Sequence, residues 1–279
     1  MDIVHFNHQN RDTYQSKTGQ VVAIGFFDGL HRGHQRVIKE AKKIAEKKQL
    51  PLACMSFFPH PKEVLTNNNK QFQYIMPLAE KQKELENMGI ETLYLIEFDL
   101  AFASLSPEQF VQKYLLDLGV TYVVAGFDFT YGSRGMGNMD RIQADSHNQL
   151  EAIKVEKVAH NGKKVSSTLL RQMIHSGQMD QIHHYLGRDY QIEAEVFLNK
   201  YDADVDVKNH YLIPPSGIYD VKVQNESGSW RQEAIVDQGQ IKLPLTKGSE
   251  RLIKQDSNVR IHWINQLFSG LLSHVMQSV

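Results

Sequence analysis

Two histidines, His31 and His34, lie three residues apart just after an apolar stretch of the chain. The stretch over residues 21–27 is rich in β-forming residues and predicts a strand that is buried on both faces. A helical pattern begins near Gly33, so both imidazoles lie at a helix N-terminus and on one face of its first turn. This position suits a phosphate, because helix N-termini present N–H groups and a positive dipole end. Imidazoles there can donate hydrogen bonds to a phosphoryl oxygen that gains negative charge.

Other interpretations of the two histidines are open at this point. A His-x-x-His pair can belong to a metal site, but no other histidine or cysteine cluster nearby completes one. Two surface histidines without a role are the second alternative. The segment contains neither Gly-x-Gly-x-x-Gly nor Gly-Lys-Ser/Thr, so it is neither a dinucleotide fingerprint nor a P-loop. We favour phosphate binding and predict no metal ligands among the protein side chains.

A second candidate segment follows the apolar run over residues 52–58. Residues 56–65 have the sequence Ser-Phe-Phe-Pro-His-Pro-Lys-Glu-Val-Leu. The prolines make the chain rigid, and the aromatic side chains can pack against a planar ring. The alternative is a rigid exit from a strand with Phe57 packed in the core.

Two later segments carry polar groups that suit phosphates. Residues 126–135, Gly-Phe-Asp-Phe-Thr-Tyr-Gly-Ser-Arg-Gly, follow another apolar run. Asp128 could hold a hydroxyl or an ion-bound water, and Arg134 could meet a phosphate; a buried turn aspartate and a surface arginine are the alternatives. Residues 165–171, Val-Ser-Ser-Thr-Leu-Leu-Arg, place helix-capping hydroxyls before a short predicted helix. The guanidinium of Arg171 suits bidentate contact with a pyrophosphate.

These segments need a scaffold, and the first two thirds of the chain predict one. Apolar strand-like runs alternate there with amphipathic helical stretches. Strands are expected over residues 21–27, 52–58, 92–98 and 121–125, and helices over residues 33–48, 77–88 and 106–119. This alternation is typical of an α/β fold with a mostly parallel sheet covered by helices on both sides. Ligands bind such sheets at the carboxyl ends of the strands, near the switch in strand order.

The pattern changes after about residue 187. Short β-forming stretches separated by turn residues then predict a small antiparallel β-barrel. They cover residues 191–198, 217–223, 233–236, 240–245 and 259–263, and a closing helix is expected over residues 267–276. We therefore predict two domains, residues 1–186 and 187–279.

Residues 25–34 resemble the His-x-Gly-His signature of the nucleotidyltransferase superfamily. They are most similar to the adenylyltransferase domain of bacterial bifunctional riboflavin kinase/FAD synthetases. The resemblance extends to Phe-x-Pro-His-Pro at 57–61, to Gly-x-Asp-Phe-x-Tyr-Gly at 126–132 and to Ser-Ser-Thr-x-Leu-Arg at 166–171. Tyr131 replaces the family's second phenylalanine. The resemblance covers residues 1 to about 186 well and the remainder weakly.

The resemblance implies a Rossmann-like nucleotidyltransferase domain that joins the AMP part of ATP to FMN, giving FAD and pyrophosphate. Mg²⁺ is expected to accompany ATP with few protein ligands. His31, His34 and Arg171 are implied to be catalytic. ATP binding is implied for Gly25, Phe26, Phe27, Asp28, Gly33, Ser167 and Thr168, and flavin binding for Phe58, Pro59, His60, Pro61, Asp128 and Arg134.

The C-terminal third departs from this family. Bifunctional members carry Gly-Phe-Pro-Thr-Ala-Asn in a riboflavin kinase barrel, and we do not find that segment in the sequence. Residues 199–208 stand in the corresponding region, whereas Gly-Ile-Tyr at 217–219 resembles the family's Gly-Val-Tyr strand. We therefore expect a degenerate kinase barrel without riboflavin kinase activity, whose remaining role is structural or oligomeric.

Composition narrows the choice of partners and compartment. The formal net charge of −1 gives no electrostatic basis for nucleic-acid or membrane partners, and no apolar run is long enough to span a bilayer. The single cysteine, Cys54, lies in an apolar run and is expected to be a buried hydrophobe. The N-terminal residues lack a signal-peptide pattern. We expect a cytoplasmic enzyme that binds ATP and FMN, and we leave homo-oligomerisation open.

Three alternatives accompany this prediction. An adenylyltransferase for another small phosphate substrate, such as pantetheine phosphate or nicotinate mononucleotide, is not expected to carry Phe-x-Pro-His-Pro. A non-catalytic flavin- or nucleotide-binding regulatory protein would not need His31, His34 and Arg171. A class I aminoacyl-tRNA synthetase also uses His-x-Gly-His, but the chain lacks the expected anticodon-binding region and basic surface.

Overall fold

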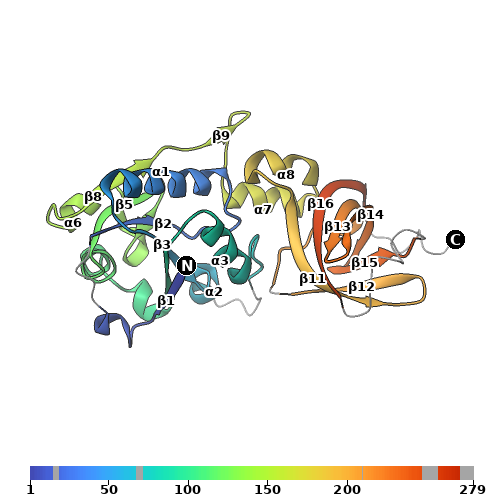
Figure 1. Ribbon diagram of the computed structural model, residues 1–279, viewed down its shortest axis with the longest axis horizontal. Coiled ribbons are helices and arrows are strands. Elements are labelled where there is room, and N and C mark those ends of the chain that lie inside the picture. Colours follow the sequence, from blue (N-terminus) through green and yellow to red (C-terminus); the bar gives the residue numbers. More distant parts are fainter. Residues whose placement is uncertain (15–18, 67–71, 209, 247–256, 271–279) are drawn as a thin grey trace. The chain divides into compact units, whose positions relative to one another are not determined.

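The computed structural model describes residues 1–14, 19–66, 72–208, 210–246 and 257–270. The chain divides into two compact units, Met1–Phe72 with Leu78–Ala159 and Gln73–Pro77 with His160–Val279 (Figure 1). We call them the sheet unit and the barrel unit. The domain boundary that the sequence predicts at residue 186 stays a prediction. The compact units divide at residue 159, so two helices up to residue 186 belong to the barrel unit. These are α7 (Ser167–His175) and α8 (Met179–Leu186).

The sheet unit contains a six-stranded sheet in the order β1-β4-β3-β2-β5-β8, and all neighbouring strands are parallel. The strands are β1 (Asp2–Phe6), β2 (Gln20–Ile24), β3 (Leu52–Phe58), β4 (Thr92–Glu97), β5 (Val120–Gly126) and β8 (Glu151–Val155). The four predicted strands are the four central ones, which confirms the parallel α/β prediction. The edge strands β1 and β8 escaped prediction because their exposed polar side chains interrupt the apolar pattern.

Helices cover both faces of this sheet. They are α1 (Arg32–Lys48), α2 (Pro61–Leu65), α3 (Leu78–Asn87), α4 (Leu100–Ala103), α5 (Pro107–Val111), the π-helical segment η2 (Gln112–Leu116) and α6 (Ile142–Asp145). Val22 and Ile24 of β2 pack into one core cluster with Phe110 and Tyr114 from α5 and η2. Successive strand residues point to opposite faces, so the neighbouring residues of β2 face the other side, where α1 crosses the sheet.

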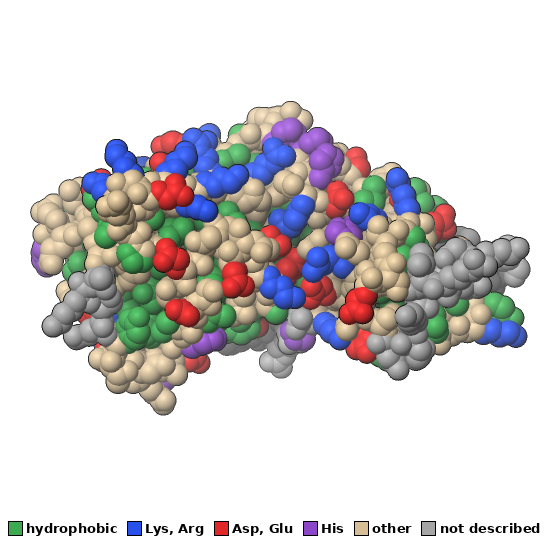
Figure 2. Space-filling view, viewed as in Figure 1, with side chains coloured by type: hydrophobic (Ala, Val, Ile, Leu, Met, Phe, Trp, Pro, Cys, Tyr) green, Lys and Arg blue, Asp and Glu red, His purple; other side chains and the backbone are tan. Residues whose placement is uncertain are grey.

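Helix α1 follows its predicted pattern. Val37, Ile38, Ala41 and Ala45 are buried, whereas its lysines are exposed to solvent. Figure 2 shows these basic side chains gathered over the outer surface of α1. The helix predicted over residues 106–119 forms in two pieces, α5 and η2. It begins, as expected, with a Ser106 N-cap and a proline in the first turn.

The barrel unit contains a closed antiparallel barrel in the order β11-β12-β15-β14-β13-β16, which confirms the barrel prediction. Its strands are β11 (Tyr190–Leu198), β12 (Asp202–Val207), β13 (Gly217–Asn225), β14 (Gly228–Asp237), β15 (Gln240–Pro244) and β16 (Ser257–Ser269). Strand β12 was missed because its outward aspartates alternate with only two buried side chains, Ala203 and Val205.

The closing helix predicted over residues 267–276 is wrong for residues 267–269. These residues continue β16, because that strand pairs with β13 as far as Ser269. The rest of the predicted helix, apart from residue 270, lies outside the described residues. Among the described helices, none is both long and apolar enough to cross a membrane.

Candidate active site

Three of the predicted site segments begin at the same edge of the sheet. Residues 25–34, 56–65 and 126–135 follow or end β2, β3 and β5, which are adjacent in the order β3-β2-β5. These strands are parallel, so their carboxyl ends lie side by side. The strand order also reverses between β2 and β5, since β3 and β4 continue on one side and β8 on the other. This is the switch point at which open α/β sheets bind ligands.

The loop between β2 and α1 has an unusual backbone. Phe27, Gly29 and Leu30 all have positive φ angles, of 55°, 84° and 43°. Phenylalanine and leucine adopt this conformation only when the surroundings impose it, and such positions cluster at functional sites. The Phe27 ring is fully buried, and a Cβ atom at Gly25 would lie 3.0 Å from it. Glycine at that position therefore lets the ring turn under the loop.

His31 and His34 lie at the N-terminus of α1, as the sequence predicted. His31 is the N-cap residue, and its Nδ1 accepts a hydrogen bond from the backbone N–H of His34 at 3.2 Å. Because Nδ1 is the acceptor, a neutral His31 carries its proton on Nε2. The two rings stack with centroids 3.6 Å apart and an interplanar angle of 16°. The rings of Phe27 and His34 form a T-shaped pair, with their centroids 5.2 Å apart.

His34 is held in its neutral form. Burial is the main cause that lowers its pKa well below the ordinary value, and the positive charges of His31 and Lys81 act in the same direction. Its Nδ1 atom is buried and has no hydrogen-bond partner within the described part of the chain. A neutral imidazole keeps one N–H, which can donate a hydrogen bond to an anion.

His60 connects two of the predicted segments. Its ring packs against the Phe26 ring in a T-shaped arrangement, with the ring centroids 4.4 Å apart. It also stacks on the Phe72 ring, with the centroids 4.0 Å apart. Its backbone N–H donates to Glu63 and its Nδ1 accepts from the N–H of Lys62, so the residue also caps α2. The aromatic prediction for this segment thus corresponds to an aromatic cluster that joins the ends of β2 and β3.

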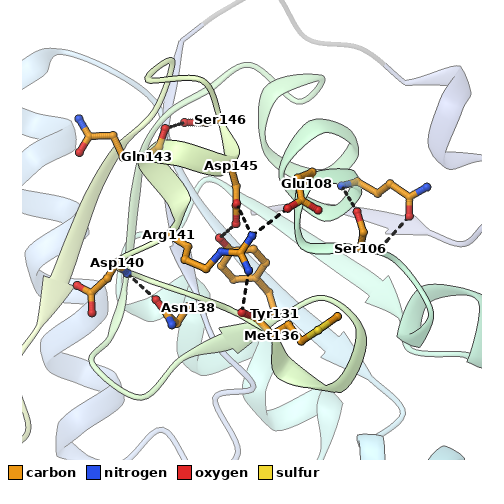
Figure 3. A network of polar contacts seen from close by, with 11 residues as sticks. Ser106, Glu108, Tyr131, Met136, Asn138, Asp140, Arg141, Gln143, Asp145 and Ser146 are labelled. Carbon is orange, nitrogen blue, oxygen red and sulfur yellow. Dashed lines mark hydrogen bonds and ion pairs between the residues drawn. The ribbon is translucent and has the colours of Figure 1, made fainter.

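The segment after β5 is anchored by a polar network (Figure 3). The Tyr131 hydroxyl donates to Asp145 at 2.6 Å, and Arg141 pairs with Asp145 at 2.8 Å and with Glu108 at 2.9 Å. Burial and the hydrogen bond to Asp145 raise the pKa of Tyr131, so the phenol stays protonated. The phenol that replaces the family's phenylalanine therefore gains a buried acceptor.

Asp128 and Arg134 project from this anchored segment. Both are exposed to solvent, which rules out the alternative of a buried turn aspartate. Arg134 has a positive φ angle of 55°. Their exposure leaves both side chains accessible to a ligand at the edge of the sheet.

The remaining predicted residues belong to the barrel unit. The Ser166 hydroxyl caps α7 by accepting from the N–H of Leu169 at 3.2 Å. Ser167 and Thr168 form the first turn of that helix. Arg171 donates from Nη1 to the Gln73 carbonyl at 2.7 Å, a contact that the sequence did not predict. That these residues bind the phosphates of ATP stays a prediction.

Cys54 and Lys81 are two further buried residues of the sheet unit. Cys54 is buried, and burial raises the pKa of its thiol, in keeping with the expected hydrophobic role. Lys81 was missed by the sequence analysis, although it is almost fully buried and bonds to Ser56 and to the Phe26 carbonyl. Its position offered a signal, because Lys81 lies one helical turn from Leu85, on the apolar face of α3.

A family model described as FAD synthetase matches residues 13–169. The chain belongs to the FAD synthetase family. The bifunctional riboflavin kinase/FMN adenylyltransferase of Bacillus subtilis is 38% identical over 232 residues, which cover 80% of this chain and 73% of the relative. The FAD synthetase of Listeria monocytogenes is 28% identical over 209 residues, which cover 75% and 81%.

The fold likeness extends beyond the FAD synthetase match. A solved structure described as a macrolide-efflux protein from Streptococcus pneumoniae has a TM-score of 0.85 and 27% identity, and the likeness covers 99% of this chain and 95% of that one. The FAD synthetase match itself includes the three segments at the sheet edge and the first turn of α7, and it ends before Arg171 and the barrel. Membership of the predicted family is therefore confirmed.

Proposed function

We propose that the chain is an FMN adenylyltransferase without riboflavin kinase activity. It transfers the AMP part of ATP to the phosphate of FMN, giving FAD and pyrophosphate. The observation that supports this best is the stacked pair of His31 and His34 beside the contact between His60 and Phe26. The proposed phosphate-binding histidines and the proposed flavin-binding His60 thereby meet at the loop between β2 and α1, at the switch point of the sheet.

The reaction needs no nucleophile from the protein. A phosphate oxygen of FMN attacks the α-phosphorus of ATP, and the bond to the β-phosphate oxygen breaks as pyrophosphate leaves. The protein must align the two substrates and stabilise the charge that develops on the phosphoryl oxygens. His31 does this as a donor from Nε2, and His34 does so as a neutral donor.

The other predicted residues divide between the two substrates. The β- and γ-phosphates accept hydrogen bonds from Ser167, Thr168 and Arg171. The same hydrogen bonds hold the pyrophosphate when its bond to the α-phosphorus breaks. Gly25, Phe26, Phe27, Asp28 and Gly33 form the ATP-binding loop around the histidines. Phe58, Pro59, His60, Pro61, Asp128 and Arg134 bind the flavin and its phosphate.

Mg²⁺ accompanies ATP in this proposal. Mg²⁺ keeps several waters and needs only one or two carboxylates when phosphates supply other ligands. The exposed carboxylate of Asp128 lies at the sheet edge and fits that demand. Asp128 would hold an ion-bound water, and the ion would neutralise phosphate charge.

The proposed loss of riboflavin kinase activity rests on the barrel sequence. Gly-Phe-Pro-Thr-Ala-Asn is absent from the chain, and residues 199–208, which stand in its place, lead into and form β12. The barrel is then a structural or oligomeric module. We also propose a cytoplasmic location, with ATP and FMN as ligands and without nucleic-acid or membrane partners.

One assay tests both parts of the proposal. The purified chain is incubated with ATP, Mg²⁺ and either FMN or riboflavin, and the flavins are separated by chromatography. We expect FAD from FMN and no FMN from riboflavin. Formation of FMN would refute the loss of kinase activity, and failure to form FAD would refute the transferase. Parallel reactions with pantetheine phosphate and nicotinate mononucleotide test the other substrates, and flavin binding without turnover would indicate the regulatory alternative.

A further inference from the structure

A buried ammonium group lies beneath the loop that carries the two histidines. Lys81 of α3 is only 2% exposed. Its Nζ donates to the Ser56 hydroxyl at 3.0 Å and to the Phe26 carbonyl at 3.2 Å, and it lies 5.2 Å from the centre of the Phe26 ring. The Ser56 hydroxyl also donates to the same carbonyl at 3.1 Å. Three elements of the sheet unit therefore meet at one backbone oxygen.

Within the described part of the chain the ammonium forms no salt bridge, although the negative charge of Asp28 acts on it from a longer distance. No carboxylate among the described residues forms a salt bridge with Nζ, and its two hydrogen-bond acceptors there are both uncharged. Burying a charge in this way is costly unless it is paired. An apolar side chain at this position of α3 would meet the needs of packing at lower cost. A charge retained at a ligand-binding edge therefore points to a function beyond packing.

We propose that Lys81 is a positioning residue for adenylyl transfer, which holds the Phe26 carbonyl and places a fixed positive charge behind the loop that receives the triphosphate of ATP. This inference rests on the proposed function. The hydrogen bonds to the Phe26 carbonyl fix the loop between β2 and α1. That loop ends at the N-cap His31. The charge attracts the phosphates through the loop without contacting the reacting atoms.

The charged groups around Lys81 come from every element packed against it. Burial lowers the pKa of Lys81 to about 8, and Asp28 of the loop and Cys54 of β3 act in the opposite direction by favouring its charged form. On α1, the positive charge of Lys81 acts on His34 and lowers its pKa. Lys81 is therefore charged at neutral pH and loses its proton as the pH rises through about 8.

The test compares three variants in steady-state kinetics with FMN, ATP and Mg²⁺. We expect Lys81→Met to raise KM for ATP about tenfold or more and to lower kcat, with a smaller effect on KM for FMN, because the charge-assisted hydrogen bond to the Phe26 carbonyl of the ATP-binding loop is lost. Ser56→Ala keeps the charge and removes one anchor, so it should give a smaller change in the same direction. Lys83→Met replaces an exposed lysine of the same helix and is the matched control.

The pH dependence separates positioning by charge from packing. In the wild type, KM for ATP should rise above pH about 8 as Lys81 loses its proton. Lys81→Arg keeps its charge in that range and should lose this limb of the profile. In Lys81→Met, the pKa of His34 should rise, which the imidazole ¹⁵N shifts report without turnover.

The outcomes distinguish this inference from the proposed function. If the wild type makes no FAD, the proposed function fails. If the wild type is active but Lys81→Met and Ser56→Ala match Lys83→Met in both KM values, the role of Lys81 is refuted. Should Lys81→Met not fold, Ser56→Ala and the pH profile of the wild type still decide: a normal KM for ATP in Ser56→Ala, or a flat profile above pH about 8, overturns the proposal.

Discussion

The imidazole rings of His31 and His34 stack at 3.6 Å, and the backbone N–H of His34 donates to Nδ1 of His31. The two contacts fix the rings to each other and to the first turn of α1. They also exclude a state in which both rings are charged, since two stacked cations would repel each other strongly at this distance. Because Nδ1 of His31 accepts and the pKa of His34 is lowered by burial, the pair is preorganised as neutral hydrogen-bond donors.

Removing either imidazole should slow adenylyl transfer. We expect His31→Ala and His34→Ala each to lower kcat by roughly 10²-fold, the usual cost of one charge-stabilising donor. The rate of FAD formation at saturating ATP and FMN measures this. His147→Asn, at an exposed histidine of the same unit, is the control and should remain at the wild-type rate. Near-normal rates in both alanine variants would remove the pair from the mechanism.

The neutral His34, which is half-buried and has a buried Nδ1, should make stability depend on pH. Its folded pKa lies well below the ordinary value of 6.5, so the unfolded chain binds a proton first as the pH falls. Stability contributed by neutral His34 is therefore complete above pH 6.5 and is lost as the pH falls below it. The thermal midpoint of the wild type should drop between pH 7 and about 5 more than that of His34→Gln.

The comparison of the wild type with His34→Gln also controls for other groups whose pKa is shifted. Burial also lowers the pKa of His262, but this residue is present in both proteins, so its contribution cancels. Parallel curves for the two proteins between pH 7 and about 5 would contradict the assignment of a neutral His34.

The ring of His60 should affect the flavin more than the nucleotide. His60→Ala removes a ring that contacts both Phe26 and Phe72, and the loss of such contacts is worth about 1 kcal/mol. We expect KM for FMN to rise about fivefold with a smaller effect on KM for ATP. Quenching of FMN fluorescence measures binding directly. An increase confined to ATP would place His60 on the nucleotide side instead.

The network beneath the segment after β5 should contribute to stability. Tyr131→Phe removes the hydroxyl that donates to Asp145 at 2.6 Å and leaves a buried carboxylate oxygen without that donor. We expect the free energy of unfolding to fall by about 2 kcal/mol. Tyr201→Phe, at a side chain that is 73% exposed, should change it by less than about 0.5 kcal/mol.

The same network offers a second, charge-based test. The Asp145 side chain is 5% exposed, whereas its partner Arg141 is 41% exposed. Arg141→Gln should lower the free energy of unfolding, because it leaves a buried carboxylate without its cation. Lys43→Gln breaks an exposed pair with Glu40 and should cost less than about 0.5 kcal/mol. Chemical denaturation measures both, and equal effects would show that Asp145 does not depend on Arg141.

The sequence by itself determined much of this protein. The apolar run of β2 predicted a central parallel strand, and the pattern after it predicted that α1 begins beside the two histidines. Phosphate binding there stays a prediction. Such features are local, because apolar periodicity and helix caps are written in neighbouring residues. The edge strand β1 and the barrel strand β12 escaped, because the local pattern is weakest where one face of a strand meets water.

Only the tertiary structure decided which distant residues meet. Lys81 reaches the Phe26 carbonyl across 55 positions of sequence, and Gln20 bonds to Tyr94 across 74. Tyr131 finds its acceptor on α6. Each partner is chosen by sheet order and helix packing, which bring together side chains whose pairing leaves no mark in local periodicity. The apolar face of α3 could have marked Lys81 for burial, but only the fold shows that water is removed from around its charge.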